Sequence, residues 1–288
     1  MIHVGQSLQN GGDPDVALMA RAIEEAGLDG VWCGDHLAFP GQWLDSPTLL
    51  GAAAAVTERV TVGWSVMLPA LRPPAWAAKQ VASVQRISNG RLQLGVGLGR
   101  PGPEWQIAGT TQTGRAARTD AFLAALPDLL AGRPADPSLD GTLAGTTLDP
   151  AVPMPPLWIG GVSDAALRRT VRFGAGWLAS PLPPDRLAAR ARELAALAGP
   201  DQAPPRVATG VFAAPGLDAA ESAERLHGLF GLDAESAAAL ALGGSPEQLA
   251  ESLARYRDAG ADTLVVIPFG TDPFEAAGLL GRARALLG

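Results

Sequence analysis

Short runs of apolar, often β-branched residues alternate along this chain with longer segments whose apolar positions recur at helical spacing. The predicted strands cover residues 2–7, 30–33, 60–67, 91–97, 157–160, 176–179, 206–213 and 262–268. The predicted helices cover residues 13–26, 46–58, 73–87, 116–131, 163–173, 185–198, 217–230, 235–242, 245–259 and 272–287. Strands that alternate with helices in this way are typical of a parallel sheet with helices outside it.

Eight such units within 288 residues predict an α/β fold that closes into a (β/α)8 TIM barrel, with residues 1–288 as a single domain. A doubly wound open sheet is the alternative. It would usually carry the spacing G-x-G-x-x-G after the first strand, where this chain has only Gly11-Gly12. Residues 132–156 are rich in glycine and proline and have no clear period, and we interpret them as a short irregular excursion because the alternation resumes after them.

Composition and charge narrow the class of protein. Hydrophobic residues make up 47% of the chain, which is enough to bury a large core, and the net charge of -7 disfavours a nucleic-acid partner. The longest apolar run, 49–56, is far shorter than the ~20 residues that cross a bilayer, and the first residues do not form an export signal. We therefore expect a cytoplasmic protein without a membrane partner. The single cysteine, Cys33, and three dispersed histidines predict no disulfide within the chain and no metal site.

The end of the second predicted strand carries the first candidate chemistry, because functional residues of a barrel lie at the carboxyl ends of its strands. Asp35 and His36 follow that strand directly. A carboxylate next to an imidazole can orient a ligand and move a proton near neutral pH. A structural interpretation stands beside this one, in which Asp35 caps the following turn and His36 packs against a neighbour.

The third and fourth predicted strands end in small and apolar residues. Ser65 and Val66 lie near the end of the third strand, where they form either a flat platform or ordinary barrel core. Gly95 and Gly97 alternate at the end of the fourth strand and leave the backbone bare where a flat group can approach. No lysine follows, so a phosphate loop of the nucleoside-triphosphate type is excluded. Glu104, in the next loop, is a candidate acid or base, or a solvated carboxylate.

The fifth predicted strand ends in Gly160, Gly161, Val162 and Ser163, which lead into a helix. Bare backbone N–H groups, a capping hydroxyl and the positive end of a helix dipole would meet at this point and attract an anion such as phosphate. An ordinary Gly-Gly turn with Ser163 as the helix cap is the alternative, and we favour the anion site.

Taken together, these features resemble the luciferase-like monooxygenase superfamily of flavin and deazaflavin barrels, and most closely its coenzyme F420-dependent branch. The resemblance depends on the order of several blocks, of which Gly34-Asp35-His36 is one. The blocks are residues 24–32, 34–36, 53–60, 78–80, 87–92, 95–97 and 156–161. One departure is Gly174-Ala175-Gly176-Trp177, where relatives often carry Ala-Asp-Gly-Trp.

The resemblance implies a deazaflavin, coenzyme F420, or alternatively the flavin FMN, across the top of the barrel. It implies a non-prolyl cis peptide bond between Ser65 and Val66 behind the ring, with Asp35, His36 and Gly97 around it. His36 would be the proton relay, and Glu104 matches an acidic position on the loop after the fourth strand. The phosphate cradle would be formed by Gly160, Gly161, Val162 and Ser163.

The expected function is therefore hydride transfer between reduced F420 and a small organic substrate. An FMN-dependent monooxygenase is one alternative, and a flavin-binding relative without turnover is another. The resemblance also implies a homodimer, because members of this superfamily are often dimers.

Overall fold

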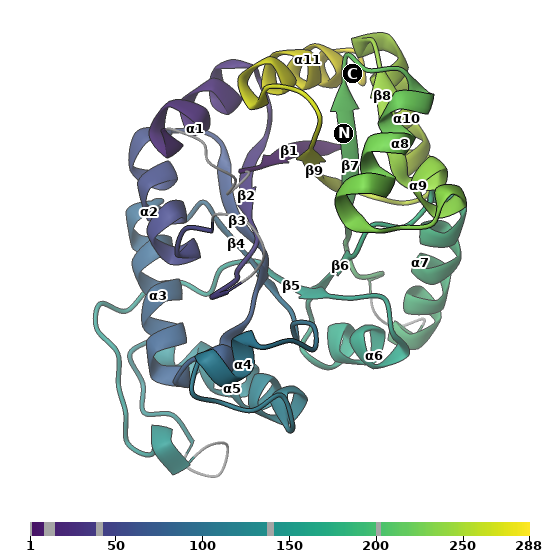
Figure 1. Cartoon of the computed structure of the whole chain (residues 1–288). Coiled ribbons are helices and arrows are strands. Elements are labelled where there is room, and N and C mark those ends of the chain that lie inside the picture. Colours follow the sequence, from purple (N-terminus) through teal and green to yellow (C-terminus); the bar gives the residue numbers. More distant parts are fainter. Residues whose placement is uncertain (1, 9–14, 39–42, 137–140, 200–202) are drawn as a thin grey trace.

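Eight parallel strands close into a barrel with helices around its outside (Figure 1). The computed structural model of the chain describes residues 2–8, 15–38, 43–136, 141–199 and 203–288. The barrel strands are β1 (His3–Ser7), β2 (Gly30–Cys33), β3 (Thr61–Met67), β4 (Leu92–Val96), β5 (Leu157–Gly160), β6 (Gly176–Ala179), β7 (Val207–Pro215) and β9 (Thr263–Pro268). The ring closes because β6 pairs with β7, and β9 pairs with both β7 and β1. The predicted (β/α)8 TIM barrel is confirmed.

The outer layer consists of helices that follow the strands along the chain. These are α1 (Val16–Glu25), α2 (Ser46–Val56), α3 (Pro74–Ile87), α4 (Glu104–Ile107), α5 (Arg115–Leu130), α6 (Asp164–Arg172), α7 (Pro184–Ala198), α8 (Ala219–Phe230), α9 (Ala234–Leu240), α10 (Pro246–Asp258) and α11 (Pro273–Ala285). Two 3-10 turns cover Pro69–Leu71 and Gly141–Leu143. In the excursion at 132–156, the buried side chains of Leu143 and Val152 pack against the core.

One predicted helix was wrong at its end, because a ninth strand, β8 (Ala241–Gly244), begins within it. The alanine-rich sequence favours a helix up to Leu242, but the chain leaves α9 at Leu240 and pairs with Phe212–Pro215 of β7. Tertiary pairing here overrides local helix propensity. The short helix α4 was also not predicted, since one helical turn leaves no periodic signal.

Helix starts differ slightly from the predicted ones. Asp15 is the N-cap of α1 and accepts from two backbone N–H groups of the first turn, whereas the predicted cap, Asp13, lies outside the described residues. Asp45 caps α2, so Ser46 is its first helical residue. Shifts of one or two residues are ordinary at helix ends. In the described part of the chain, no helix combines the length and apolar character that crossing a membrane requires.

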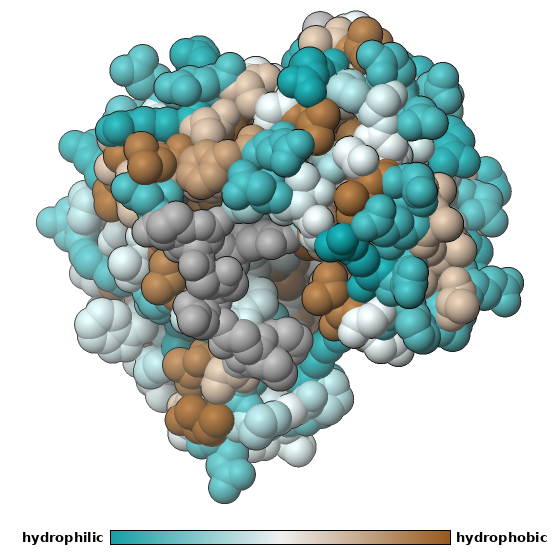
Figure 2. Space-filling model, turned by 45° about the horizontal axis from the view of Figure 1, so that its top comes forward, coloured by the Kyte–Doolittle hydropathy of each residue, from teal (hydrophilic) through white to brown (hydrophobic). Residues whose placement is uncertain are grey.

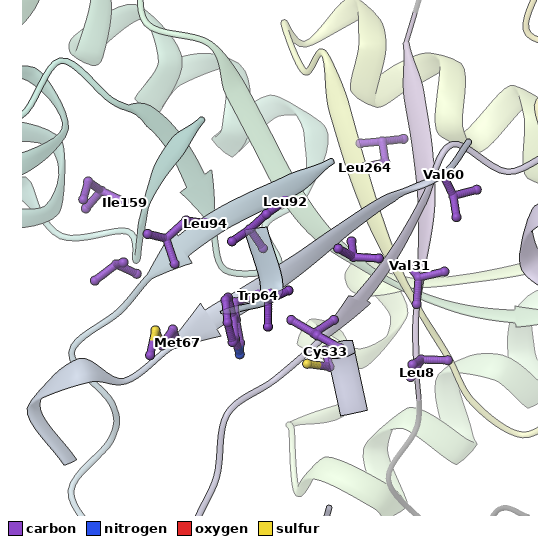
Figure 3. Packing of buried hydrophobic residues seen from close by; sticks show 14 of the residues in the cluster. Leu8, Val31, Cys33, Val60, Trp64, Met67, Leu92, Leu94, Ile159 and Leu264 are labelled. Atoms are coloured by element: carbon purple, nitrogen blue, oxygen red, sulfur yellow. The ribbon is translucent and has the colours of Figure 1, made fainter. Parts of the chain in front are cut away.

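The main core lies between the strands and the helices. Outward-facing side chains such as Val31, Trp64, Leu92 and Leu264 gather there (Figure 3). Cys33 belongs to this layer and is completely buried, as expected of a small hydrophobic residue, and burial raises the pKa of its thiol.

The start of β3 is fastened to α1 by one carboxylate. Glu24 accepts hydrogen bonds from three consecutive backbone N–H groups of residues 58–60, at 3.0, 2.6 and 3.0 Å. Partial burial raises the pKa of Glu24, but these bonds outweigh it and hold the pKa below its ordinary value of 4.5. The ionised carboxylate therefore stabilises the connection between α2 and β3.

Two tryptophans fill the inside of the barrel, and glycines make room for them. A Cβ on Gly63 would lie 2.4 Å from the ring of Trp32, and a Cβ on Gly176 would lie 2.4 Å from the ring of Trp158. A larger residue at either position would have to displace an indole. Several of the glycines on the inner face are therefore explained by packing between side chains and backbone.

Candidate functional site

Asp35 joins the carboxyl ends of β2 and β3. It is 3% exposed, and its carboxylate accepts from the Ser46 hydroxyl at 2.7 Å, the Leu68 backbone N–H at 2.8 Å and the Arg72 guanidinium at 2.5 Å. Arg72 also donates to Gln80 at 3.0 Å, which holds the guanidinium in place. The Asp35 side chain is thus occupied by the protein itself.

His36 meets Glu104 although the two residues are far apart in the sequence. Nδ1 of His36 lies 3.4 Å from Oε2 of Glu104, and the same oxygen accepts from the backbone N–H of Leu37 at 3.3 Å. The Glu104 side chain is 6% exposed and that of His36 is 21% exposed. Trp43 touches the imidazole edge-on, with ring centroids 4.7 Å apart. The arrangement combines a half-buried imidazole with a buried carboxylate that can orient it.

The peptide bond between Ser65 and Val66 is cis, as the resemblance implied. The Val66 side chain fills the space above two neighbouring strand ends. A Cβ on Gly97 would lie 2.3 Å from Cγ2 of Val66, and a Cβ on Gly160 would lie 2.7 Å from its Cγ1. The side chain of Val66 therefore lies directly against the bare backbone at Gly97 and Gly160. The half-buried side chain of Val66 thus forms the accessible surface at the ends of these strands.

The segment 160–163 leads into α6 as predicted, but its N–H groups differ in availability. The N–H of Gly161 donates to the Leu178 carbonyl at 3.2 Å, and Ser163 caps the helix by accepting from Ala166 at 3.3 Å. Val162 and Ser163 are exposed, and their own N–H groups reach no acceptor among the described residues. An anion would therefore find its donors at Val162 and Ser163, at the positive end of α6.

Arg190 adds a cation to this helix end. Its guanidinium donates from Nη2 to the Val162 carbonyl at 3.0 Å and to the Asp164 carboxylate at 2.9 Å, and from Nη1 to Glu193. Its Nε is buried and has no acceptor in the part of the chain that the structure describes. No motif in the sequence indicates this residue, because Arg190 lies on α7 and reaches the site only through the packing of α7 beside α6.

The predicted site residues share one end of the barrel. Asp35 binds the backbone of Leu68, Val66 covers both Gly97 and Gly160, and all the strands concerned run parallel. The segment 160–163 and the Asp35-His36 corner are thus linked through the end of β3. One face of the molecule is hollowed near its centre, with hydrophobic residues beside the hollow (Figure 2).

Arg72 and Trp43 were also missed by sequence reasoning. A lone arginine after Leu68-Pro69 and a lone tryptophan before α2 match no motif. Among the described residues, the structure contains no cluster of three or more potential metal ligands. This end of the barrel combines an imidazole beside a buried carboxylate with a helix start whose N–H groups at Val162 and Ser163 have no acceptor among the described residues.

The fold and the arrangement of residues at this end of the barrel correspond to a known protein family. The family model for the luciferase-like monooxygenases matches residues 2–239. The chain is a member of this family.

Relatives and solved structures extend this finding. An F420-dependent glucose-6-phosphate dehydrogenase of Beutenbergia cavernae is 34% identical over 176 residues, which are 57% of this chain and 52% of that protein. The chain thus spans about half the length of that dehydrogenase. The fold is shared with an F420-dependent secondary alcohol dehydrogenase in complex with an F420-acetone adduct, at a TM-score of 0.81, 17% identity and coverage of 100% and 99% of the two chains.

It is also shared with the oxygenating constituent of 3,6-diketocamphane monooxygenase from a plasmid of Pseudomonas putida, in complex with FMN. There the TM-score is 0.72 and the identity 17%, with 97% of each chain covered.

Proposed function

We propose that this protein is an oxidoreductase that uses coenzyme F420 to transfer a hydride to or from a small organic substrate, with His36 as the proton relay. The observation that carries the proposal is the contact of His36 with the buried Glu104, at the same end of the barrel as Val66. The F420-dependent dehydrogenase that is 34% identical supports this choice of cofactor.

The residues present fit an anionic cofactor with a flat ring. The exposed amides of Val162 and Ser163, at the positive end of α6, provide donors for a phosphate. Arg190 lies beside them, and its guanidinium also pairs with Asp164 and Glu193. Val66 offers an apolar surface, and the cis bond before it lies where the resemblance implied it. When bound, the cofactor would supply or accept the hydride.

The role of the protein is to bind, orient and exchange a proton. Oε2 of Glu104 lies 3.4 Å from Nδ1 of His36, just beyond a regular hydrogen bond. In this proposal the carboxylate orients the imidazole, and Nε2 is the nitrogen that exchanges a proton with the substrate oxygen. Asp35 holds this corner through the Leu68 backbone N–H and the Arg72 guanidinium. In this proposal Asp35 and Glu104 position the site, whereas His36 acts on the substrate.

Parallel titrations with F420 and FMN test the choice of cofactor. We expect F420 to bind more tightly, and replacement Arg190→Gln to weaken that binding. The matched control is Arg192→Gln, because Arg192 is an exposed arginine on the same helix. Tight binding of FMN alone would favour a monooxygenase, a function that the FMN-containing structural neighbour supports. Binding of neither compound would overturn the proposal.

Turnover tests the role of His36. Secondary alcohols and sugar phosphates are the first substrates to try, because the two F420-dependent relatives carry those names. Replacement His36→Gln should lower kcat by about 10²–10⁴-fold while cofactor affinity stays the same. The exposed histidine of α8 provides the control His227→Gln. Unchanged turnover in His36→Gln would remove the relay from the mechanism.

Assembly as a homodimer and a cytoplasmic location stay predictions. Sedimentation of the purified protein tests the first, and fractionation of the source cells tests the second.

A further inference from the structure

A cavity of about 150 Å³ opens at the amino-terminal end of the barrel, opposite the strand ends that carry the candidate site. Its lining comes from the beginnings of the strands, including His3 of β1, Thr61 of β3 and Thr263 of β9. Nothing in the proposed reaction uses this end of the barrel. The polar groups that face the cavity are mainly hydrogen-bond donors.

The first donor is the indole of Trp32. The residue is 2% exposed, yet its Nε1–H donates to no acceptor among the described residues. Gly5 and Gly30 keep the space around this nitrogen open, because a Cβ on either would lie 2.5 or 2.8 Å from Nε1. This N–H group faces the cavity, so an acceptor held there can bind it in place of water.

Gln93 and Arg206 add further donors to the cavity. The Gln93 carbonyl oxygen already accepts from the Trp158 indole at 2.9 Å, which orients the amide and leaves its NH₂ group for another partner. The Arg206 guanidinium lies over the Trp158 ring, 4.6 Å from its centroid, and donates from Nη2 to Asp262 at 3.1 Å. The remaining N–H groups of Arg206 have no acceptor within the described ranges.

The carboxylates and hydroxyls near the cavity are already engaged. The Asp29 carboxylate accepts from the Val4 backbone at 2.8 Å and pairs with Arg284 at 3.0 Å. The hydroxyl of Thr61 donates to the Asp29 carbonyl at 3.1 Å, and that of Thr263 donates to Asp262 at 3.0 Å. Each nearby carboxylate is thus neutralised by an arginine. The cavity therefore suits a ligand that only accepts hydrogen bonds.

We propose that this cavity binds a small monocarboxylate, whose oxygens accept from Trp32, Gln93 and Arg206. The volume of about 150 Å³ corresponds to roughly five water molecules at ~30 Å³ each, which matches a short-chain acid of propanoate size. The short alkyl chain lies against the indole of Trp32. This site is separate from the proposed function, and the two can fail independently.

The test follows the indole N–H signals of the protein labelled with ¹⁵N-tryptophan during titration with sodium propanoate at constant ionic strength. The replacement Trp32→Phe identifies which of the signals from the seven tryptophans belongs to Trp32. We expect that signal to shift and saturate, whereas neutral propanamide should need at least about tenfold higher concentration. Shifts that do not saturate, or that affect most indoles equally, would overturn the proposal.

Two variants of lining residues and one control variant test which side chains bind propanoate. Gln93→Glu keeps an acceptor for Trp158 but replaces the amide donors by a negative charge, so propanoate should bind at least about tenfold more weakly. Arg206→Gln should also weaken binding, and the protein should stay folded because the Arg206 side chain is exposed. Arg257→Gln removes another exposed arginine, on α10, and should change nothing. Equal affinity in Gln93→Glu, Arg206→Gln and the unmodified protein would refute the site.

Discussion

Replacement Asp35→Asn tests whether the carboxylate that joins β2 and β3 is a structural link. The substitution keeps the size of the side chain and removes its charge. Asparagine can still accept one or two of the three hydrogen bonds from Ser46, Leu68 and Arg72. The main loss is the ion pair, which leaves Arg72 without its carboxylate partner.

The magnitude follows from burial. The side chains of Asp35 and Arg72 are 3% and 17% exposed, so solvent screens this pair only weakly. Removing one partner of a buried pair typically costs ~3–5 kcal/mol. We expect the lower end, about 3 kcal/mol, because Arg72 keeps its bond to Gln80 and can turn toward solvent. A domain has a total stability of ~5–15 kcal/mol, so the effect is easily measured.

Urea unfolding of the purified variants measures this loss, with a surface pair as the control. Asp128 and Arg133 form a comparable ion pair, but their side chains are 39% and 62% exposed. Replacement Asp128→Asn should therefore cost less than ~1 kcal/mol. If Asp35→Asn cost no more than Asp128→Asn, the assignment of Asp35 as a structural link would be wrong. A loss of F420 binding at full stability would instead make Asp35 a cofactor ligand.

Three further predictions concern packing, acid stability and thiol reactivity. Gly95→Ala should destabilise by at least about 2 kcal/mol in urea unfolding, because its Cβ would lie 2.1 Å from the Trp64 carbonyl oxygen, whereas Gly102→Ala meets nothing within 4 Å and should be neutral. The lowered pKa of Glu24 means that its stabilisation is present above the ordinary value of 4.5 and is lost as the pH falls through the folded-state pKa. Stability measured against pH should thus fall less steeply in acid for Glu24→Gln than for the unmodified protein. Cys33, which is 0% exposed and whose thiol pKa is raised by burial, should react with a thiol reagent only after unfolding, and rapid labelling of the native protein would contradict its placement.

Much of the fold could be predicted from the sequence because strand and helix periods are local properties. The strands 30–33, 157–160 and 176–179 agree with the structure at both ends, and the alternation of elements was sufficient to predict the closed barrel. The site segments followed from the rule that barrel strands present function at their carboxyl ends. The exceptions, such as β8, are places where pairing with a distant strand outweighs the local preference.

The sequence by itself determined the order of the eight barrel strands, and its resemblance to the luciferase-like superfamily implied the cis bond between Ser65 and Val66. Only the tertiary structure decided which groups meet: Glu104 beside His36, Arg72 on Asp35, and Arg190 at the start of α6. It also decided that Val66 covers Gly97 and Gly160. Periodicity states whether a side chain faces inward or outward, but its partner depends on how separate elements pack, and that is a property of the whole barrel.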